Sequence, residues 1–339
     1  MKKPPMSICP GKWAATIAVV TGALGAAARA EAGIIAVWGD DKYGTVSKVP
    51  AGTDFKAVSG GYAGGIALHA NGSIAAWGYD GDLAVSTAPT GAGFTAVTGD
   101  GQTDFALRAD GSIAAWGDDY YGAVSQAPAG AFKAISGGAI GGIALRDDGS
   151  IAAWGKDYNG YNTAAHAPTG VGFIAVAGNG ITDFALRANG SVVVWGYDGS
   201  HAVSNAPATG DFTAISGSGY GGVALGADGS IATWGYNGNG EITNAPTGTG
   251  FTAVAGDGDT DYALRSNGSI VAWGLDYYHA VSNAPTGTDF LSIGGGDRSV
   301  GFAIESNAVV PEPGTLTLFG LGALSTLWRL RRGARSCPR

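Results

Sequence analysis

The amino-acid sequence predicts an all-β protein, and more specifically a seven-bladed β-propeller built from four-stranded antiparallel blades. Three observations predict this fold. The dipeptide Trp-Gly recurs seven times at intervals of 38 to 41 residues, each interval contains four short runs of β-type sequence, and the partial repeats at the two ends complement each other. The seven tryptophans are Trp38, Trp77, Trp116, Trp154, Trp195, Trp234 and Trp273.

One repeat illustrates the four expected strands. Its first strand is expected at Phe-Thr-Ala-Val (94–97), its second at Phe-Ala-Leu (105–107) and its third at Ser-Ile-Ala-Ala-Trp-Gly (112–117). Asp110-Gly111, between the second and third runs, is the sequence signal for a tight hairpin. Ala-Val-Ser-Gln-Ala-Pro (123–128) is expected to form the fourth strand.

The first and last segments of the repeated region are each incomplete. Residues 33–38 match a third strand without the two strands before it, whereas residues 290–293 and 302–304 match a first and second strand. Together they would form one blade. We therefore expect the ring to be closed by pairing of the N- and C-terminal strands, with the propeller occupying residues 31–306.

The repeat resembles that of the regulator of chromosome condensation family over about residues 33–306. The shared pattern is approximately Ala-Leu-x-x-Asp-Gly-x-Val-x-x-Trp-Gly, present here in a form with short loops. The family often has His before this Ala-Leu, whereas the chain alternates Gly64-Gly65 with Thr103-Asp104. The resemblance implies a propeller fold. It does not imply the family's exchange-factor role, which requires nuclear partners that an exported protein never meets.

Residues 1–30 have the pattern of a secretory signal peptide. Lys2, Lys3 and Lys12 give it a basic start, residues 13–28 are apolar or small, and Ala28-Arg29-Ala30 fits a cleavage site that ends at Ala30. A retained membrane anchor is the alternative, but the segment is short for a span and contains few large apolar residues. Export is therefore the expectation.

Residues 307–339 resemble a PEP-CTERM sorting signal, consisting of a linker, a short apolar helix and a basic tail. Pro311-Glu312-Pro313 precedes the apolar run 315–328, and four arginines follow within residues 329–335. A helix of this length would extend about 21 Å, less than the roughly 30 Å of a hydrocarbon core. The resemblance implies an exosortase-type processing enzyme as a partner and transient membrane contact. It also implies export across the inner membrane to the surface or extracellular matrix of a Gram-negative bacterium.

Composition excludes several classes of function. The formal net charge is −8, and the region between the two signals is more acidic still because basic residues are concentrated at the ends. An acidic body is unsuited to nucleic acid, whose phosphates require Lys and Arg. Cys9 and Cys337 both lie in the end segments, so the mature protein is expected to lack disulfides and Cys-bound metal.

Tyrosine and aspartate cluster in the loops that follow Trp-Gly. Strands that alternate in direction place these loops, and those joining the first and second strands, on one face of the propeller. Exposed tyrosines supply contact area at low entropic cost, so this face is the predicted binding surface. Turn chemistry copied by duplication is the alternative explanation. The candidate residues are Tyr43, Tyr79, Tyr120, Tyr121, Tyr158, Tyr197, Tyr236, Tyr277, Tyr278, Asp118 and Asp119.

No cofactor is expected, although two acidic patterns leave calcium as a weaker alternative. Asp257, Asp259 and Asp261 space oxygen ligands as a Ca²⁺ site does, but hydrogen-bonded Asx turns explain the same pattern. Thr-Asp precedes the second strand in alternate repeats. We expect the three aspartates of these pairs to surround the mouth of the central channel, and they are Asp104, Asp183 and Asp261.

The sequence contains no catalytic motif. Nucleophile-elbow, P-loop and zinc-protease signatures are missing, and the four histidines build no constellation common to the repeats. We therefore predict a non-enzymatic binding module whose ligand is a protein or polysaccharide. A structural matrix component without a defined ligand, or a glycan-acting enzyme that uses two loop carboxylates, are the alternatives.

Overall fold

The computed structural model describes nine segments of the chain: residues 32–61, 63–99, 102–138, 141–156, 164–178, 182–218, 220–257, 259–295 and 300–307. The chain divides into two compact units, Met1–Ser306 and Asn307–Arg339. The expected signal peptide ending at Ala30, the sorting residues Pro311, Glu312 and Pro313, and the candidate Tyr158 lie outside the described residues.

All regular elements in the described segments are β-strands. Each repeat contributes a first strand that begins at or near its phenylalanine, a second that contains Ala-Leu or its equivalent, and a third that ends in Trp-Gly. The first strands are β2 (Phe55–Gly61), β5 (Phe94–Gly99), β8 (Ala134–Gly138), β11 (Phe173–Gly178), β14 (Phe212–Ser218), β17 (Phe251–Asp257) and β20 (Phe290–Gly295). The second strands are β3 (Gly64–His69), β6 (Thr103–Arg108), β9 (Gly141–Leu145), β12 (Thr182–Arg187), β15 (Gly221–Gly226), β18 (Thr260–Arg265) and β21 (Val300–Ser306). The third strands are β1 (Gly33–Gly39), β4 (Ile74–Gly78), β7 (Ile113–Gly117), β10 (Ile151–Gly155), β13 (Val192–Gly196), β16 (Ile231–Gly235) and β19 (Ile270–Gly274).

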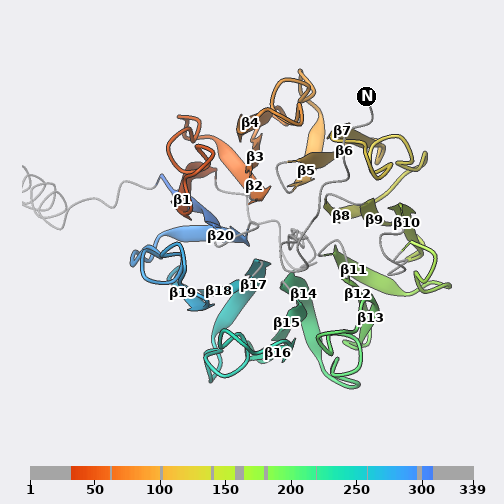
Figure 1. Cartoon of the computed structure of the whole chain (residues 1–339), viewed down its shortest axis with the longest axis vertical. Coiled ribbons are helices and arrows are strands. Elements are labelled where there is room, and N and C mark those ends of the chain that lie inside the picture. The colour runs from red at the N-terminus through yellow and green to blue at the C-terminus, as the bar shows by residue number, and fades with distance from the viewer. Residues whose placement is uncertain are drawn as a thin grey trace, which may run out of the picture. The chain divides into compact units, whose positions relative to one another are not determined.

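These strands form five three-stranded sheets and one six-stranded sheet with the order β20-β21-β1-β2-β3-β4. In the six-stranded sheet, β1 pairs antiparallel with β21 along its whole length, from Gly33 opposite Ser306 to Gly39 opposite Val300. The contact of β1 with β2 is a single pair, Gly33 with Phe55. In Figure 1 the sheets of the first unit follow one another around a common centre, with first strands such as β14 and β17 innermost.

The expectation of a fourth strand in each repeat was wrong. The segment that begins at Ala123 forms consecutive turns, in which Gln126 N–H donates to Gly122 C=O at 3.1 Å. Val124 N–H and Ser125 N–H both donate to Asp119 Oδ1, at 2.9 and 2.8 Å. These backbone donors are therefore already engaged and cannot join a β-ladder, although the local Ala-Val-Ser pattern resembles a strand.

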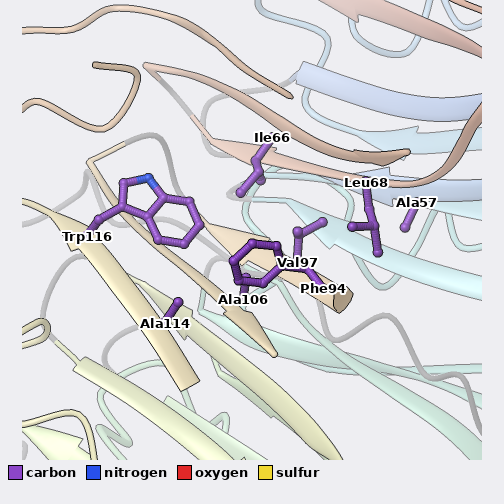
Figure 2. Close-up of a cluster of buried hydrophobic side chains, with 8 residues drawn as sticks. All are labelled: Ala57, Ile66, Leu68, Phe94, Val97, Ala106, Ala114 and Trp116. Atoms are coloured by element: carbon purple, nitrogen blue, oxygen red, sulfur yellow. The ribbon is translucent and has the colours of Figure 1, made fainter. Parts of the chain in front are cut away.

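The aromatic residues of the repeat form the core, as their regular positions indicate. All seven repeat tryptophans are at most 7% exposed, and six of the seven repeat phenylalanines are buried; Phe212 is partly exposed. Figure 2 shows one cluster, in which Ile66 and Leu68 of β3 face Phe94, Val97 and Trp116 of the next sheet. Apolar burial between the faces of neighbouring sheets thus holds consecutive repeats together.

A hydrogen bond from each of several tryptophans also crosses to the neighbouring repeat. Trp77 Nε1 donates to Thr45 C=O at 2.8 Å, and Trp116 Nε1 donates to Ala84 C=O at 2.9 Å. The acceptor always belongs to the loop after the third strand of the preceding repeat. The loops that carry the tyrosines are therefore anchored to the core of the next repeat.

Candidate ligand-binding surface

The loops that follow Trp-Gly lie beside the loops that join the first and second strands. We call six of these Trp-Gly loops the tyrosine loops, and they comprise residues 40–45, 79–84, 118–123, 197–202, 236–241 and 275–280. Asp118 N–H donates to Gln102 C=O at 2.8 Å, and Thr103 Oγ1 donates to Asp118 C=O at 2.8 Å. Thr260 Oγ1 makes the equivalent contact with Leu275 C=O at 2.7 Å. The two sets of loops thus lie at the same end of the strands.

The hairpins between the second and third strands lie at the other end, next to the segment that enters the following sheet. Gly111 N–H donates to Arg108 C=O, and Phe132 N–H of the next repeat donates to Gly111 C=O, both at 2.9 Å. The arginines of these hairpins pack on phenylalanine rings of the core. Arg108 lies 5.3 Å from the Phe94 ring centre and Arg265 lies 4.5 Å from that of Phe251. These arginines therefore contribute packing as well as charge.

Two of the candidate tyrosines project furthest into solvent. Tyr120 is 76% exposed and Tyr277 is 70% exposed. Each stands edge-to-face on the next tyrosine in the chain. The Tyr120 and Tyr121 ring centres are 4.7 Å apart at 89°, and those of Tyr277 and Tyr278 are 4.6 Å apart at 85°. The same pair, in which an exposed tyrosine stands on a partly buried one, thus occurs in two separate repeats.

Other candidate tyrosines lie back against their own loops. The Tyr79 hydroxyl lies directly over Gly81, where an added Cβ would come within 2.0 Å of the oxygen. The Tyr197 and Tyr236 hydroxyls occupy the same place over the glycine two residues later in their loops. Tyr79 also contacts Tyr43 of the preceding tyrosine loop, with ring centres 5.2 Å apart. Tyr79 and Tyr236 are each 44% exposed, less than Tyr120 and Tyr277.

The aspartates of the tyrosine loops help to hold the loops in shape. Asp119 Oδ1 accepts from Val124 N–H and Ser125 N–H, and Asp276 Oδ1 accepts from Val281 N–H and Ser282 N–H in the same way. Asp118 Oδ1 accepts from Tyr120 N–H at 2.9 Å. The hydrogen bond from the backbone of Ser125 is the main reason that the pKa of Asp119 is lowered. The loops therefore carry ionised carboxylates beside the tyrosines at neutral pH.

The tyrosine loops also contain backbone strain. Leu83, His201 and His279 adopt left-handed conformations with φ of 63°, 60° and 61°, where the other three tyrosine loops have Gly44, Gly122 and Gly240. Such a conformation is costly for a residue with a Cβ, so the loop must be held by its other contacts. The hydrogen bonds to the loop aspartates provide such contacts.

The three aspartates expected at the channel mouth lie elsewhere. Asp104, Asp183 and Asp261 are at most 7% exposed, and each is paired in register with the tryptophan of its own sheet. Burial at this position excludes them from an open channel surface, so that expectation was wrong. The corresponding residue in other repeats is glycine. At Gly65, an added Cβ would come within 2.2 Å of the Trp77 ring.

Glu241, which was not predicted from the sequence, is 6% exposed and lines the same cavity as Asp261. It occupies a position that is alanine or threonine in other tyrosine loops, such as Ala84 and Thr45. The sequence signal that could have identified Glu241 is a carboxylate at a position where other tyrosine loops have a small residue. Within the described segments, no group of three or more His, Cys, Asp or Glu side chains is placed to hold a metal ion, and the side chain of Asp257 is not described.

Comparison with solved structures shows the fold of the strand-forming region. Prp20p from Saccharomyces cerevisiae is 14% identical with a TM-score of 0.64, and the match covers 83% of this chain and 93% of that one. Human WBSCR16 is 12% identical with a TM-score of 0.63, and the match covers 83% and 100%. The receptor kinase CR4 ectodomain from Physcomitrella patens is 21% identical with a TM-score of 0.61, and the match covers 72% and 68%. The chain is therefore an all-β protein whose structural neighbours are propellers of the regulator of chromosome condensation type.

Residues 309–332 match the PEP-CTERM protein-sorting motif, which confirms the resemblance noted in the sequence. This motif indicates an exported protein associated with the cell surface or extracellular space of a Gram-negative bacterium, and it implies recognition by an exosortase. No curated protein sequence matches the chain. No helix of the described segments is long and apolar enough to cross a membrane.

Proposed function

We propose that the protein is a non-enzymatic binding module that is exported across the inner membrane and binds an extracellular polysaccharide or protein through its tyrosine loops. The single observation on which this proposal rests is the repeated aromatic pair in which exposed Tyr120 stands on Tyr121 and exposed Tyr277 stands on Tyr278. Large aromatic rings held in a fixed orientation on anchored loops are the elements that binding surfaces use.

The electrostatic setting supports the same proposal. Ionised carboxylates such as Asp119 and Asp276 flank the two pairs, and their Oδ1 atoms are engaged by the loop backbone. Such carboxylates repel polyanions, which disfavours nucleic acid as a ligand. Neutral or amino sugars and basic protein surfaces are compatible with them.

We further propose that the strand-forming region is a seven-bladed ring closed by pairing of β1 with β21. Two observations support this. First, β1 pairs with β21 in the register in which the third strand of a repeat pairs with its second strand. Second, Trp38 Nε1 donates to Ala280 C=O at 2.9 Å, as other repeat tryptophans donate to the loop of the preceding repeat. A closed ring would fix the positions of the two tyrosine pairs relative to each other, which favours a ligand that contacts both.

The proposal is tested by incubating the purified exported protein with a glycan array and with extracellular matrix material from the producing bacterium. We expect retention of a defined glycan or matrix protein, with no change in the mass of that ligand. Cleavage of a bound glycan would instead support the alternative of a glycan-acting enzyme. Absence of any bound ligand would support a purely structural role and overturn the proposal.

A further inference from the structure

A cluster of carboxylates lies where the last tyrosine loop before β17 meets the next sheet. Glu241, 6% exposed, belongs to the loop after β16, and Asp261, 1% exposed, belongs to β18. Asp259 lies partly buried in the turn between β17 and β18. The main-chain carbonyl of Glu241 accepts from Trp273 Nε1 at 3.0 Å, as Ala84 does from Trp116. Glu241 thus takes the place of a small residue within an otherwise regular repeat.

The carboxylate of Asp261 is only partly satisfied by the protein. Its Oδ1 atom is buried and has no hydrogen-bond partner, whereas the Ser218 side chain hydrogen-bonds to the same carboxylate. Burial raises the pKa of Asp261 to about 8, and the charges of Glu241 and Asp259 raise it as well. An unpaired buried carboxylate oxygen is costly, so a proton or a cation bound at this atom would stabilise it.

Hydrogen bonds hold the other two carboxylates of the cluster in place. Asn239 N–H donates to Glu241 Oε2 and Asn239 Nδ2 donates to Glu241 Oε1, both at 3.0 Å. Asn239 Nδ2 also lies 3.3 Å from Asp259 Oδ1. The Glu241 carboxylate is therefore fixed in orientation beside the cavity that it shares with Asp261, as a preorganised ligand requires.

The cavity itself is small and negatively charged. Its lining includes Ser218, Tyr220, Glu241 and Asp261, and the described residues that line it include no Lys, Arg or His. The free space is about 10 Å³, which suits roughly one water-sized sphere. A single ion fits this space, whereas a small organic ligand does not.

We propose that this cavity binds one hard divalent cation, for which Ca²⁺ is the probe, between the carboxylates of Glu241 and Asp261. The hydroxyl of Ser218 and water would complete an all-oxygen ligand set of the kind Ca²⁺ takes, and Asp259 would add charge from outside. Only two carboxylates are direct ligands, because no three acidic, His or Cys side chains of the described segments converge on one point. The ion would join the loop after β16 to β18 of the following repeat.

The site differs from the one suggested by the spacing of Asp257, Asp259 and Asp261. It uses one residue of that set as a ligand and takes its second carboxylate from the preceding repeat. A proton held by the Asp261 and Glu241 carboxylates is the competing explanation for their proximity. A test must therefore separate a bound cation from a bound proton.

The test is calorimetric titration of the EDTA-treated exported protein with CaCl₂ near pH 8, together with its Tm in CaCl₂ and in EDTA. We expect one Ca²⁺ per chain and a higher Tm with Ca²⁺. Glu241→Ala restores the residue found at Ala84 and should therefore fold, but it should weaken binding at least tenfold. Asp104→Asn is the matched control, because Asp104 pairs with Trp116 as Asp261 pairs with Trp273, and it should leave binding unchanged.

Two results would overturn the proposal. One is the absence of both binding heat and a Ca²⁺-dependent Tm in the unaltered protein near pH 8. The other is unchanged Ca²⁺ affinity in Glu241→Ala. Asp261→Asn provides a second check with little change in volume, and it should lose the Ca²⁺-dependent rise in Tm.

Discussion

Trp38 Nε1 donates a hydrogen bond to Ala280 C=O at 2.9 Å, although the two residues are 242 positions apart in the chain. Trp116 and Ala84 have the same relationship at a separation of 32 positions. The first and last parts of the strand-forming region are thus in contact through the same bond that joins consecutive repeats. This equivalence allows the contact between the two ends to be tested against an internal one.

Trp38→Phe should destabilise the protein about as much as Trp116→Phe. Each change removes one buried N–H donor and leaves a carbonyl unsatisfied, which costs about 1–3 kcal/mol. Urea unfolding of both variants measures the two losses. If Trp38→Phe is nearly neutral while Trp116→Phe is not, the ends of the region do not form an equivalent contact in solution.

Asp119→Ala should lower the free energy of unfolding by about 1–2 kcal/mol, because two backbone N–H groups lose their acceptor. Asp119→Asn should have little effect, since Asn237 accepts from Ile242 N–H and Thr243 N–H in the equivalent loop. Denaturant unfolding at neutral pH checks both. Equal losses for the two variants would show that charge, and not the acceptor, matters.

The stability that Asp119 contributes to the folded protein depends on pH, and the direction of this dependence follows from its pKa. The pKa of Asp119 is lower in the folded protein, so its stabilising effect is present above the unfolded-chain pKa and is lost as pH falls through the folded value. Below about pH 4, the unaltered protein should therefore lose stability relative to Asp119→Asn. Unfolding measured from pH 3 to pH 7 gives this comparison.

Gly117→Ala should be more damaging than Gly91→Ala. Both glycines have positive φ, 99° and 97°, but an added Cβ at Gly117 would come within 2.2 Å of Gln102 O, whereas Gly91 has open space. The positive φ alone makes alanine cost about 1–3 kcal/mol at either position, and a steric clash adds to this cost only at Gly117. Thermal unfolding of the two variants separates these effects; equal losses would mean that the loop at Gln102 moves aside freely.

The repeat made much of this structure predictable. Strands that end in Trp-Gly, the hairpin at Asp110-Gly111 and the buried tryptophans follow from local patterns repeated many times. The prediction of a fourth strand was wrong because hydrogen bonds to Asp119 determine the conformation of that segment. The alternation of residue types in the sequence does not reveal these hydrogen bonds. Glu241 was missed because its significance depends on the packing of one repeat against Asp261 of the next.

The site was predictable only in part. The sequence indicated which loops hold the tyrosines, but it did not distinguish Tyr120, which projects, from Tyr79, which lies over Gly81. Tyr79 directly follows Trp77-Gly78 and lies over Gly81, whereas Tyr120 stands two positions later in its loop and contacts Tyr121. Side-chain orientation of this kind depends on the folded loop.

The most direct test of the proposed function is a binding isotherm for the retained ligand, measured with the unaltered protein and with Tyr120→Ser combined with Tyr277→Ser. Both rings are exposed, so the change should alter stability by less than about 0.5 kcal/mol. Val171→Ser is the control, because Val171 is 66% exposed and precedes β11 at the opposite end of the strands. We expect at least a tenfold loss of affinity in the tyrosine variant and none in the control. Unchanged affinity in the tyrosine variant would contradict the proposal that these loops form the binding surface.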